Sequence, residues 1–523
     1  MKKALFITLA FLTVFSAAVF AGGCSQAGRT GGNAPGYTGN LPYAEFDWYI
    51  GNNPAGSPDI PVVNDALNAY IGPKINAKVN VHYWPSADWE TRMTVMVSSG
   101  QDLGIIGFGS QSKLDYLIQS QRGSFYPIEK LLDQYGPKTK ALFNKGVWDA
   151  MTINGHIYGI PSLKDNCYII SFIYNEEMAK KLGVDAAKVP YTGGWYKLES
   201  WLNDVKAKRD QIMGANIEEP LIWNSELEMP YNFALNTMLN DSFLAVTNID
   251  GIMDIAGYDS KTVFNLYGTK EYRDFAHAQW RMAQKNILAY DYTDKEQWQY
   301  TGNVFGFVGW GYTYMPEHLY GSAFTTKMVE PARVWTDTQN FYSAGTAISA
   351  ASKNPDRAMM FLELVNNDPF VATMMRFGVE GQHYKKDAQG KMTFEGTRNA
   401  NAAERGYYYW YNAPVGNLTI VNAPEDHAGP NGIMFTKMNQ FNSAAKQPAY
   451  MGFSFDIQPV SNEIAACTNV VMEYRDTLRR GQAGSEAEVD RLIDEFNAKL
   501  KANGLDKILA EAQRQANAFL ASR

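Results

Sequence analysis

Cysteine and histidine are scarce in this sequence of 523 residues, which holds three cysteines and six histidines. Cys24, Cys167 and Cys467 lie far apart and in no metal-ligand spacing, which excludes a disulfide-dense scaffold. The latter two are expected to be free buried thiols, with one long-range disulfide as the alternative. The histidines include no HExxH pair, so a zinc hydrolase is not indicated. We therefore expect no metal and no cofactor.

Neither sign of charge dominates the sequence. Lys and Arg number 47 against 54 Asp and Glu, without a long block of one sign, which argues against a nucleic-acid-binding surface. The chain contains neither the GxxxxGK[ST] motif nor a dinucleotide fingerprint, so it is not expected to bind ATP. The expected partners are neutral small-molecule solutes and other proteins.

Long apolar runs are absent except at the amino terminus. Two lysines precede an uninterrupted run from Ala4 to Ala21, which is typical of a signal peptide over residues 1–23. The small residues before Cys24 resemble a lipobox, in which the cysteine is lipidated and anchors the protein. Ala21 stands where the usual lipobox has Leu, so cleavage after Ala21 is the alternative. We expect an exported protein, lipid-anchored at the cell membrane and facing the periplasm or the cell exterior.

Residues 24–40 lack bulky aliphatic side chains. Five glycines occur in this stretch, which predicts a flexible tether between the lipid anchor and the folded part. The remaining residues, about 480 in number, exceed what a single core usually organises, so two lobes are expected.

Strand-like and helix-like segments alternate after the tether. Residues 46–50, 79–83 and 103–106 have the pattern of strands, and the segments between them have the apolar spacing of helices. This alternation predicts an α/β fold with a parallel sheet, whose ligands bind at the carboxyl ends of the strands.

Helix signals continue to the end of the chain. Asn354 and Pro355 predict a helix start, and Ser485 with Glu488 forms a capping box before an apolar stripe that we expect to end at Gly504. Apolar residues from Ile508 onward predict a last amphipathic helix.

Several motifs resemble the family 1 extracellular solute-binding proteins of ABC importers. Other segments look like the LplA-like lipoprotein branch of that family. The family motifs are INGHIYGIP from Ile153, YNE from Tyr174 and GTAIS from Gly345, and the branch segments are FGVEGQHY from Phe377, FSFD from Phe453 and GLDK from Gly504.

This resemblance implies a two-lobed fold of the periplasmic-binding-protein type (type II), with a hinge and a ligand cleft between the lobes. It also implies ABC permease subunits as partners and a monomeric protein. The implied crossovers lie near residues 162–166, 335–345 and 385–400. The corresponding domain map assigns 41–163 and 340–390 to an N-lobe, and 164–339 and 391–523 to a C-lobe.

Aromatic residues make up 13% of the chain, and such rings stack on the apolar faces of sugars. Core packing is the alternative for each of them, because aromatic side chains also dominate interiors. The stacking candidates, chosen at strand ends or in glycine-rich loops, are Trp48, Phe108, Trp223, Trp310 and Tyr312.

Four polar residues are candidates for hydrogen bonding to the ligand, namely Asn52, Ser110, Asn166 and Glu380. Asn and Ser commonly cap their own turns, so loop capping is the alternative for these residues, and Glu380 could equally be a helix-end charge.

Together these features predict a substrate-binding lipoprotein of an ABC importer that captures a carbohydrate, and we assign no catalytic residue. No nucleophile elbow occurs and no local motif singles out a pair of acids, so an enzyme is not favoured. The alternatives are a secreted carbohydrate-degrading enzyme and a binding protein for a peptide or other non-sugar solute.

Overall fold

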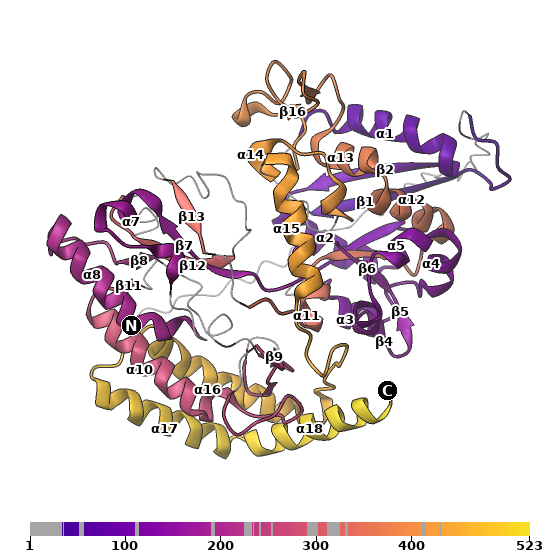
Figure 1. Cartoon of the computed structure of the whole chain (residues 1–523). Coiled ribbons are helices and arrows are strands. Elements are labelled where there is room, and N and C mark those ends of the chain that lie inside the picture. The colour runs from indigo at the N-terminus through magenta and orange to yellow at the C-terminus, as the bar shows by residue number, and fades with distance from the viewer. Residues whose placement is uncertain are drawn as a thin grey trace, which may run out of the picture.

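Two separate hydrophobic cores divide the protein into an N-lobe and a C-lobe that lie side by side (Figure 1). The two-lobed α/β fold was predicted. The predicted export signal, Cys24 and most of the tether lie outside the described residues. The computed structural model describes residues 34, 36–51, 57–109, 114–189, 194–223, 233, 235–239, 242–252, 255–289, 302–310, 325–329, 333–409, 415–428 and 430–523.

A five-stranded sheet organises the N-lobe, with the strand order β2-β1-β3-β14-β6. β1 runs parallel to β2 and β3, as predicted, whereas β14 runs antiparallel to β3 and β6 because it enters from the other lobe. The strands are β1 (Ala44–Gly51), β2 (Ala77–Trp84), β3 (Ile105–Phe108), β6 (Gly159–Pro161) and β14 (Gly345–Ile348).

Alternation along β1 decides which side of this sheet is the core. Phe46, Trp48 and Ile50 are buried, whereas the residues between them are half-buried. Trp48 meets Phe361 edge to face, with ring centroids 6.1 Å apart. The helices of this lobe are α1 (Ile60–Ile75), α2 (Ser86–Ser98), α3 (Tyr116–Gln121), α4 (Glu129–Tyr135), α5 (Pro137–Ala141), α6 (Lys145–Ala150), α12 (Pro355–Asn367) and α13 (Pro369–Phe377).

The C-lobe has a second five-stranded sheet, ordered β11-β8-β12-β7-β13. β7 runs antiparallel to β12 and β13, and β8 runs parallel to its two neighbours. The strands are β7 (Ile170–Asn175), β8 (Ile222–Trp223), β11 (Leu288–Ala289), β12 (Gly306–Trp310) and β13 (Thr326–Met328).

Helices from the middle and from the carboxyl-terminal part of the chain complete the C-lobe core. α7 begins at Glu176, directly after Asn175, whose side chain accepts a hydrogen bond from the Met178 amide at 2.9 Å. The helices are α7 (Glu176–Leu182), α8 (Glu199–Met213), α10 (Lys270–Gln284), α16 (Ser461–Arg479), α17 (Glu486–Ala502) and α18 (Leu505–Ala521).

The capping box predicted at the start of α17 is present, whereas the glycine predicted to end this helix has a different role. The Ser485 hydroxyl accepts from the Glu488 amide at 3.2 Å, while the Glu488 carboxylate accepts from the Gly484 amide at 2.8 Å. Gly504 was expected to end this helix. It instead follows the C-cap residue Asn503 and is the N-cap of α18, with a φ of +95°.

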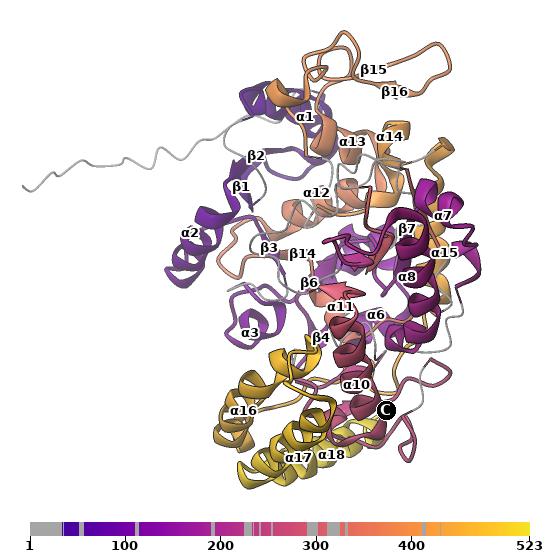
Figure 2. The ribbon, with the colours of Figure 1, turned by 90° about the vertical axis from the view of Figure 1, so that its left-hand side faces the viewer.

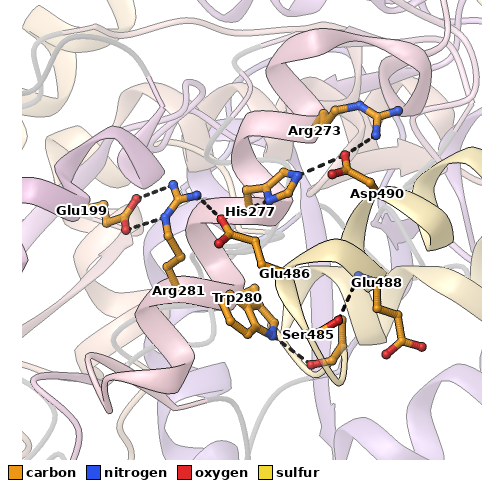
Figure 3. A network of polar contacts seen from close by, with 10 residues as sticks. Glu199, Arg273, His277, Trp280, Arg281, Ser485, Glu486, Glu488 and Asp490 are labelled. Atoms are coloured by element: carbon orange, nitrogen blue, oxygen red, sulfur yellow. Dashed lines mark hydrogen bonds and ion pairs between the residues drawn. The ribbon is translucent and has the colours of Figure 1, made fainter.

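A network of ion pairs fastens α17 to the rest of the C-lobe (Figure 3). Arg281 of α10 forms two hydrogen bonds to Glu199 of α8, at 2.8 and 2.7 Å, and one to Glu486 of α17 at 2.8 Å. His277 lies between Glu486 and Asp490, at 3.3 and 3.1 Å. Bidentate arginine pairs fix geometry as well as charge, so three helices are held in one arrangement.

The structure corrects the domain map between residues 391 and 444. Tyr407 and Tyr409 belong to the N-lobe core, and Tyr409 stacks on Tyr83 with centroids 4.0 Å apart. Two further helices, α14 (Glu425–Ala428) and α15 (Ile433–Ala444), extend this lobe. A satellite core attaches the segment to α13 and consists of Ala372, Phe377, Tyr384, Met392, Leu418, Val421, Ala428, Met434, Phe435 and Met438.

The third crossover therefore lies at the end of α15 and just after it, near residues 442–450, and not at 385–400. The expected position instead holds a hairpin on the N-lobe, β15 (Lys385–Lys386) with β16 (Met392–Thr393). Two other short pairs are β4 (Thr152–Ile153) with β5 (His156–Ile157), and β9 (Asn236–Thr237) with β10 (Val246–Thr247). No helix in the described part of the chain is long and apolar enough to cross a membrane.

Arg281→Met is expected to lower the free energy of unfolding of the C-lobe by about 1 kcal/mol, because it removes the pairs that join α8 and α10 to α17. The loss should shrink at high salt, which screens ion pairs. Arg491→Met is the matched control, since Arg491 pairs only with Glu488 and Glu495 on α17 itself. Urea denaturation at two salt concentrations measures both variants. An equal loss in the control would show that the network adds nothing beyond surface charge.

Candidate functional site

The carboxyl ends of strands from both sheets meet at the crossovers. Phe108, the last residue of β3, pairs with Gly345, which also pairs with Pro161 at the start of the first crossover. Trp310, the last residue of β12, pairs with Ile170 at the end of that crossover. In α/β sheets this edge is where ligands bind, so the space beside the crossovers is the candidate site.

Three crossing segments form what we call the hinge ribbon, residues 162–168, 333–337 and 442–446. Trp335 lies in the middle, bridged to Tyr168 on one side and Lys446 on the other. The Tyr168 amide donates to the Trp335 carbonyl at 2.7 Å, and the Thr336 amide donates to the Lys446 carbonyl at 2.9 Å. The lobes are thus connected by a narrow hydrogen-bonded ribbon.

Two asparagines satisfy the backbone where the ribbon bends. The Asn166 side chain donates to the Ser162 carbonyl at 3.0 Å and accepts from the Lys164 amide at 3.0 Å. Asn442 accepts from the Asn166 amide at 2.9 Å and donates to the Lys164 carbonyl at 2.6 Å. Asn166 therefore caps the turn, which was the alternative to a ligand contact. Its side-chain oxygen and nitrogen both form hydrogen bonds within the protein.

Asp337 is one of two buried acids of the hinge ribbon, the other being Asp165. Asp337 caps α11 (Thr338–Tyr342), accepting from the Asn340 amide at 3.0 Å, and it accepts from the Tyr168 hydroxyl at 3.2 Å. Burial raises the pKa of its carboxyl group to about 6, despite these bonds to the charged form. The Tyr168 ring stacks on Trp335, with centroids 5.0 Å apart.

A cavity of about 790 Å³ opens beside the ribbon, between α3 of the N-lobe and α16 of the C-lobe; we call it the interlobe cavity. In Figure 2, α3 lies above α16, and these two helices supply many of the lining residues. The lining residues are Asp115, Leu117, Ile118, Gln121, Arg122, Asn236, Thr237, Met238, Leu239, Ser242, Thr338, Gln339, Tyr342, Phe453, Ser454, Phe455, Asp456, Ile457, Gln458, Ile464, Thr468, Val471, Met472 and Arg475.

Exposed aliphatic side chains gather in this cavity. Eight large hydrophobic side chains are exposed among the described residues, and three of them line it. They are Ile118, Ile457 and Met472, with 46%, 42% and 65% of their surface exposed. Single exposed apolar residues need no explanation, but three that converge on one cavity mark a binding surface.

The polar lining is balanced in charge, with Asp115 and Asp456 against Arg122 and Arg475. Asp115 caps α3 by accepting from the Ile118 amide at 3.0 Å, and burial raises the pKa of its carboxyl group. The Ser242 hydroxyl is buried and has no hydrogen-bond partner among the described residues. A buried hydroxyl without a partner is unfavourable, so a ligand group that bonds to it would gain affinity.

Two of the predicted stacking residues are core residues in the structure. Trp48 is fully buried under α12, with no face open to a ligand. Phe108 is buried over Gly159 and Gly345, where a Cβ atom would collide with its ring. These glycines, which belong to β6 and β14, make room for the ring on the sheet, so Phe108 serves packing here.

Glu380 also lies away from the interlobe cavity, because it follows α13 and pairs with Lys386 of β15 at 3.1 Å. Trp223 and Trp310 end β8 and β12 at the crossover edge, but their side chains are not described. Asn52, Ser110 and Tyr312 lie outside the described residues.

The sequence analysis missed the residues that line the cavity from α3, α11 and the carboxyl-terminal region. One signal was available, since FSFD from Phe453 was noted for its resemblance but not as a site. The described residues contain no group of three or more His, Cys, Asp or Glu that could hold a metal ion. Cys167 and Cys467 are both free and buried.

Asp337→Asn is expected to change how stability depends on pH. The folded carboxyl group has a pKa of about 6 against an ordinary value of 3.8, so the folded state holds its proton more tightly. Its contribution to stability is therefore greatest below about pH 4 and is lost as the pH rises to 6, a change of about 3 kcal/mol. Asn carries no titrating proton and retains an acceptor for the Asn340 amide.

Denaturation midpoints between pH 4 and 7 measure the effect. The variant should gain stability relative to the unaltered protein as the pH rises through this range. A difference that stays constant with pH would show that Asp337 is not protonated in the folded state.

Comparison with known proteins adds to this geometry. A family model described as a domain of unknown function, DUF3502, matches residues 449–521. A carbohydrate ABC transporter substrate-binding protein of Streptococcus pneumoniae serotype 4 is 22% identical over 532 residues, covering 97% of each chain. The chain is thus similar to that transport protein from end to end.

Solved structures agree in fold. The N-glycan transport solute binding protein NgtS of Streptococcus pneumoniae has a TM-score of 0.73 at 19% identity, covering 92% of this chain and 99% of the other. Its complex with Man5GlcNAc has a TM-score of 0.62 at 20% identity, with the same coverage. A human-milk-oligosaccharide (HMO) binding protein of Bifidobacterium longum infantis has a TM-score of 0.59 at 16% identity, covering 91% and 99%. The chain therefore has the two-lobed fold of solute-binding proteins.

Proposed function

We propose that this chain is the substrate-binding component of an ABC importer and that it captures an oligosaccharide in the interlobe cavity. The observation that carries the proposal is the cavity itself, about 790 Å³ between the lobes, with exposed Ile118, Ile457 and Met472 in its wall. Small-molecule sites typically measure about 300–1,000 Å³ and combine apolar walls with a few polar groups. The end-to-end similarity to a carbohydrate transporter component supports the same conclusion.

A sugar suits the lining better than a charged solute does. The two acidic and two basic side chains balance, so no net charge selects an ion. Hydroxyl and amide groups alternate with apolar ones, which matches the hydroxyls and C–H faces of a glycan. Complexes of NgtS with Man1GlcNAc and Man5GlcNAc support a glycan as the ligand class.

Closure of the lobes would convert binding into a transport signal. The hinge ribbon joins the lobes by single segments, which suits rotation about a few backbone dihedral angles. Residues from both lobes line the interlobe cavity, so closure would bury the ligand and create the surface that docks on the permease.

Further parts of the proposal concern location and assembly. Cys24 is proposed to carry the lipid anchor of an exported monomer, with cleavage after Ala21 as the alternative. Assignment to the LplA-like branch belongs to the proposal as well, on the segments quoted from the sequence. Trp223, Trp310, Asn52, Ser110 and Tyr312 are proposed as additional ligand contacts, because each follows or ends a strand of one of the sheets.

The enzyme alternative has one observation in its favour and one against it. Asp115 lines the cavity with a raised carboxyl pKa, as a general acid would. Its carboxylate, however, is committed to the backbone as the cap of α3. A capping bond explains why an acid stands there without any catalytic task.

A thermal-shift screen of residues 41–523 against mono- and oligosaccharides, followed by product analysis of each hit, tests the proposal. A ligand that binds only the folded state stabilises it by about 2.7 kcal/mol at 100 times its dissociation constant. We expect a sugar that raises the melting temperature and is recovered intact. Recovery of cleaved sugar would establish the enzyme instead. If no glycan shifts the melting temperature and a peptide does, the ligand is a peptide and not a sugar.

Ser242→Ala then locates the ligand. Removing a buried hydroxyl that lacks a protein partner should leave the melting temperature unchanged or slightly higher. If a sugar hydroxyl bonds to Ser242, calorimetric titration should show an affinity about 3- to 10-fold lower. Ser443→Ala, on the exposed face of α15 outside the cavity, is the control. Unchanged affinity in Ser242→Ala would place the ligand elsewhere.

A further inference from the structure

The outer face of α1 is apolar, whereas the outer face of a surface helix is normally polar. Its residues there recur at intervals of three and four, so they form one stripe along the helix. This α1 stripe consists of Val62, Ala66, Ala69 and Pro73, of which only Ala66 is half-buried and the others are exposed. The charged residues of α1 are one acid and one base, Asp65 and Lys74, so the helix has no net charge.

Two polar residues of α1 point the other way, toward β2 at the edge of the N-lobe sheet. The Asn64 side chain donates to the Val81 carbonyl at 2.9 Å and accepts from the Val81 amide at 3.1 Å. Asn68 forms the same pair of bonds with Val79, at 2.9 and 2.7 Å. These side chains satisfy backbone groups that an edge strand leaves open. Because its asparagines face the sheet, α1 presents its apolar residues to the outside.

An aromatic pair widens the α1 stripe. Phe370, 40% exposed at the start of α13, lies against Tyr70 with ring centroids 4.4 Å apart. The Tyr70 hydroxyl donates to the Asp368 carboxylate at 2.9 Å, and the Lys74 ammonium group lies 4.4 Å from the centre of the Tyr70 ring. The hydroxyl and the ammonium group thus have neighbours within the protein, and the surface offers mainly carbon to a partner.

The segment that precedes β1 is fixed to the carboxyl-terminal end of α1. Asn76, fully buried there, accepts from the Ala34 amide at 2.6 Å and donates to the Leu41 carbonyl at 2.7 Å. The buried Arg357 donates to the Pro42 carbonyl at 2.9 Å. The chain therefore enters the folded part beside the end of α1.

Cys24, the proposed site of the lipid anchor, precedes Ala34 by ten residues. Ten residues span at most about 36 Å, so with a lipid on Cys24 the end of α1 stays within that distance of the bilayer. α1 and α13 lie at one end of the molecule in both Figure 1 and Figure 2, and α16, α17 and α18 lie at the other. A surface held this close by a short connection meets its partner at an effective concentration of roughly millimolar, so a weak contact suffices.

We propose that the α1 stripe, together with Tyr70 and Phe370, is a membrane-contact surface that rests on the bilayer to which Cys24 is anchored. The N-lobe then lies on the lipid and the C-lobe projects away from it. This inference rests on the proposed membrane anchoring and goes beyond it by assigning the surface that faces the lipid.

A lipid surface suits these residues better than a protein partner does. Protein interfaces have about one hydrogen bond per 100–200 Å², and the side chains of Val62, Ala69, Pro73 and Phe370 have neither donor nor acceptor. Apolar side chains with a tyrosine and a lysine beside them are typical of residues at the boundary between headgroups and acyl chains.

An environment-sensitive dye on the α1 stripe tests the contact. Residues 25–523, with a histidine tag in place of Cys24, are held by a nickel-chelating lipid on vesicles of phosphatidylcholine and phosphatidylglycerol. The dye is attached to Ala69→Cys, because Cys167 and Cys467 are buried. We expect its emission to shift to shorter wavelength on the vesicles. Val95→Cys is the matched site for the dye, since Val95 is 65% exposed on α2, and no shift is expected there.

Val62→Glu combined with Phe370→Glu is expected to abolish the shift at residue 69, because a carboxylate resists transfer out of water. Val95→Glu combined with Ile212→Glu is the matched control. It replaces two exposed apolar residues outside the surface, on α2 and α8, with the same charge, and should leave the shift unchanged. The melting temperature reports whether either pair of changes disturbs the fold.

The outcomes separate this inference from the proposals on which it rests. If the emission at residue 69 does not shift, or shifts equally at residue 95, the membrane-contact surface is refuted. A shift that needs vesicles made from cell membranes, with their proteins, also refutes it and identifies a protein partner. The histidine tag replaces the lipid, so no result depends on lipidation of Cys24. Sugar binding, measured on the same protein, tests the proposed function separately.

Discussion

Backbone hydrogen bonds within the hinge ribbon are the interaction on which the two-lobed arrangement depends. The chain crosses between the lobes in single segments, so each crossing carries backbone groups that no sheet or helix satisfies. Trp335 pairs with both Tyr168 and Lys446, and the backbone hydrogen bonds of these pairs join the three crossing segments into one ribbon. Asn166 and Asn442 satisfy the remaining groups at the bend.

The same ribbon sets the position of the cavity. β3 and β12 both end at the crossovers, and α3, the next described helix after β3, contributes residues to the cavity wall. α11 directly follows the second crossing segment, so Thr338, Gln339 and Tyr342 form a part of the wall that belongs to neither sheet. A ligand in the cavity would therefore contact both lobes and the connection between them, which is the geometry that the proposed lobe closure requires.

Much of the fold followed from local patterns. Alternation along β1 and the proline at the start of α12 are properties of a few neighbouring residues, and both elements formed where they were predicted. The third crossover was misplaced for the opposite reason. Nothing local distinguishes residues 391–444 from a C-lobe segment, and their place depends on distant contacts such as Tyr409 on Tyr83.

The site was harder to predict than the fold. Aromatic residues at strand ends looked like stacking platforms, but Trp48 and Phe108 fill space left by distant partners, Phe361 and the two glycines of β6 and β14. Exposed aliphatic residues gave no signal in the sequence, since an isolated Ile118 or Met472 resembles any core residue. They can be identified as cavity residues only in the structure, where elements far apart in the chain bring them to one cavity.

α16 contributes both to the C-lobe core and to the lining of the interlobe cavity, largely through different side chains. Its buried face, with Cys467 and Tyr474, is fixed by packing against α17 and tolerates little change. Thr468 and Met472 on its cavity side do not pack in the core, so their side chains can be substituted. A single helix anchored on one side can therefore present different ligand-contacting residues on the other without loss of the fold. The ion pairs that hold α17 make that anchoring possible (Figure 3).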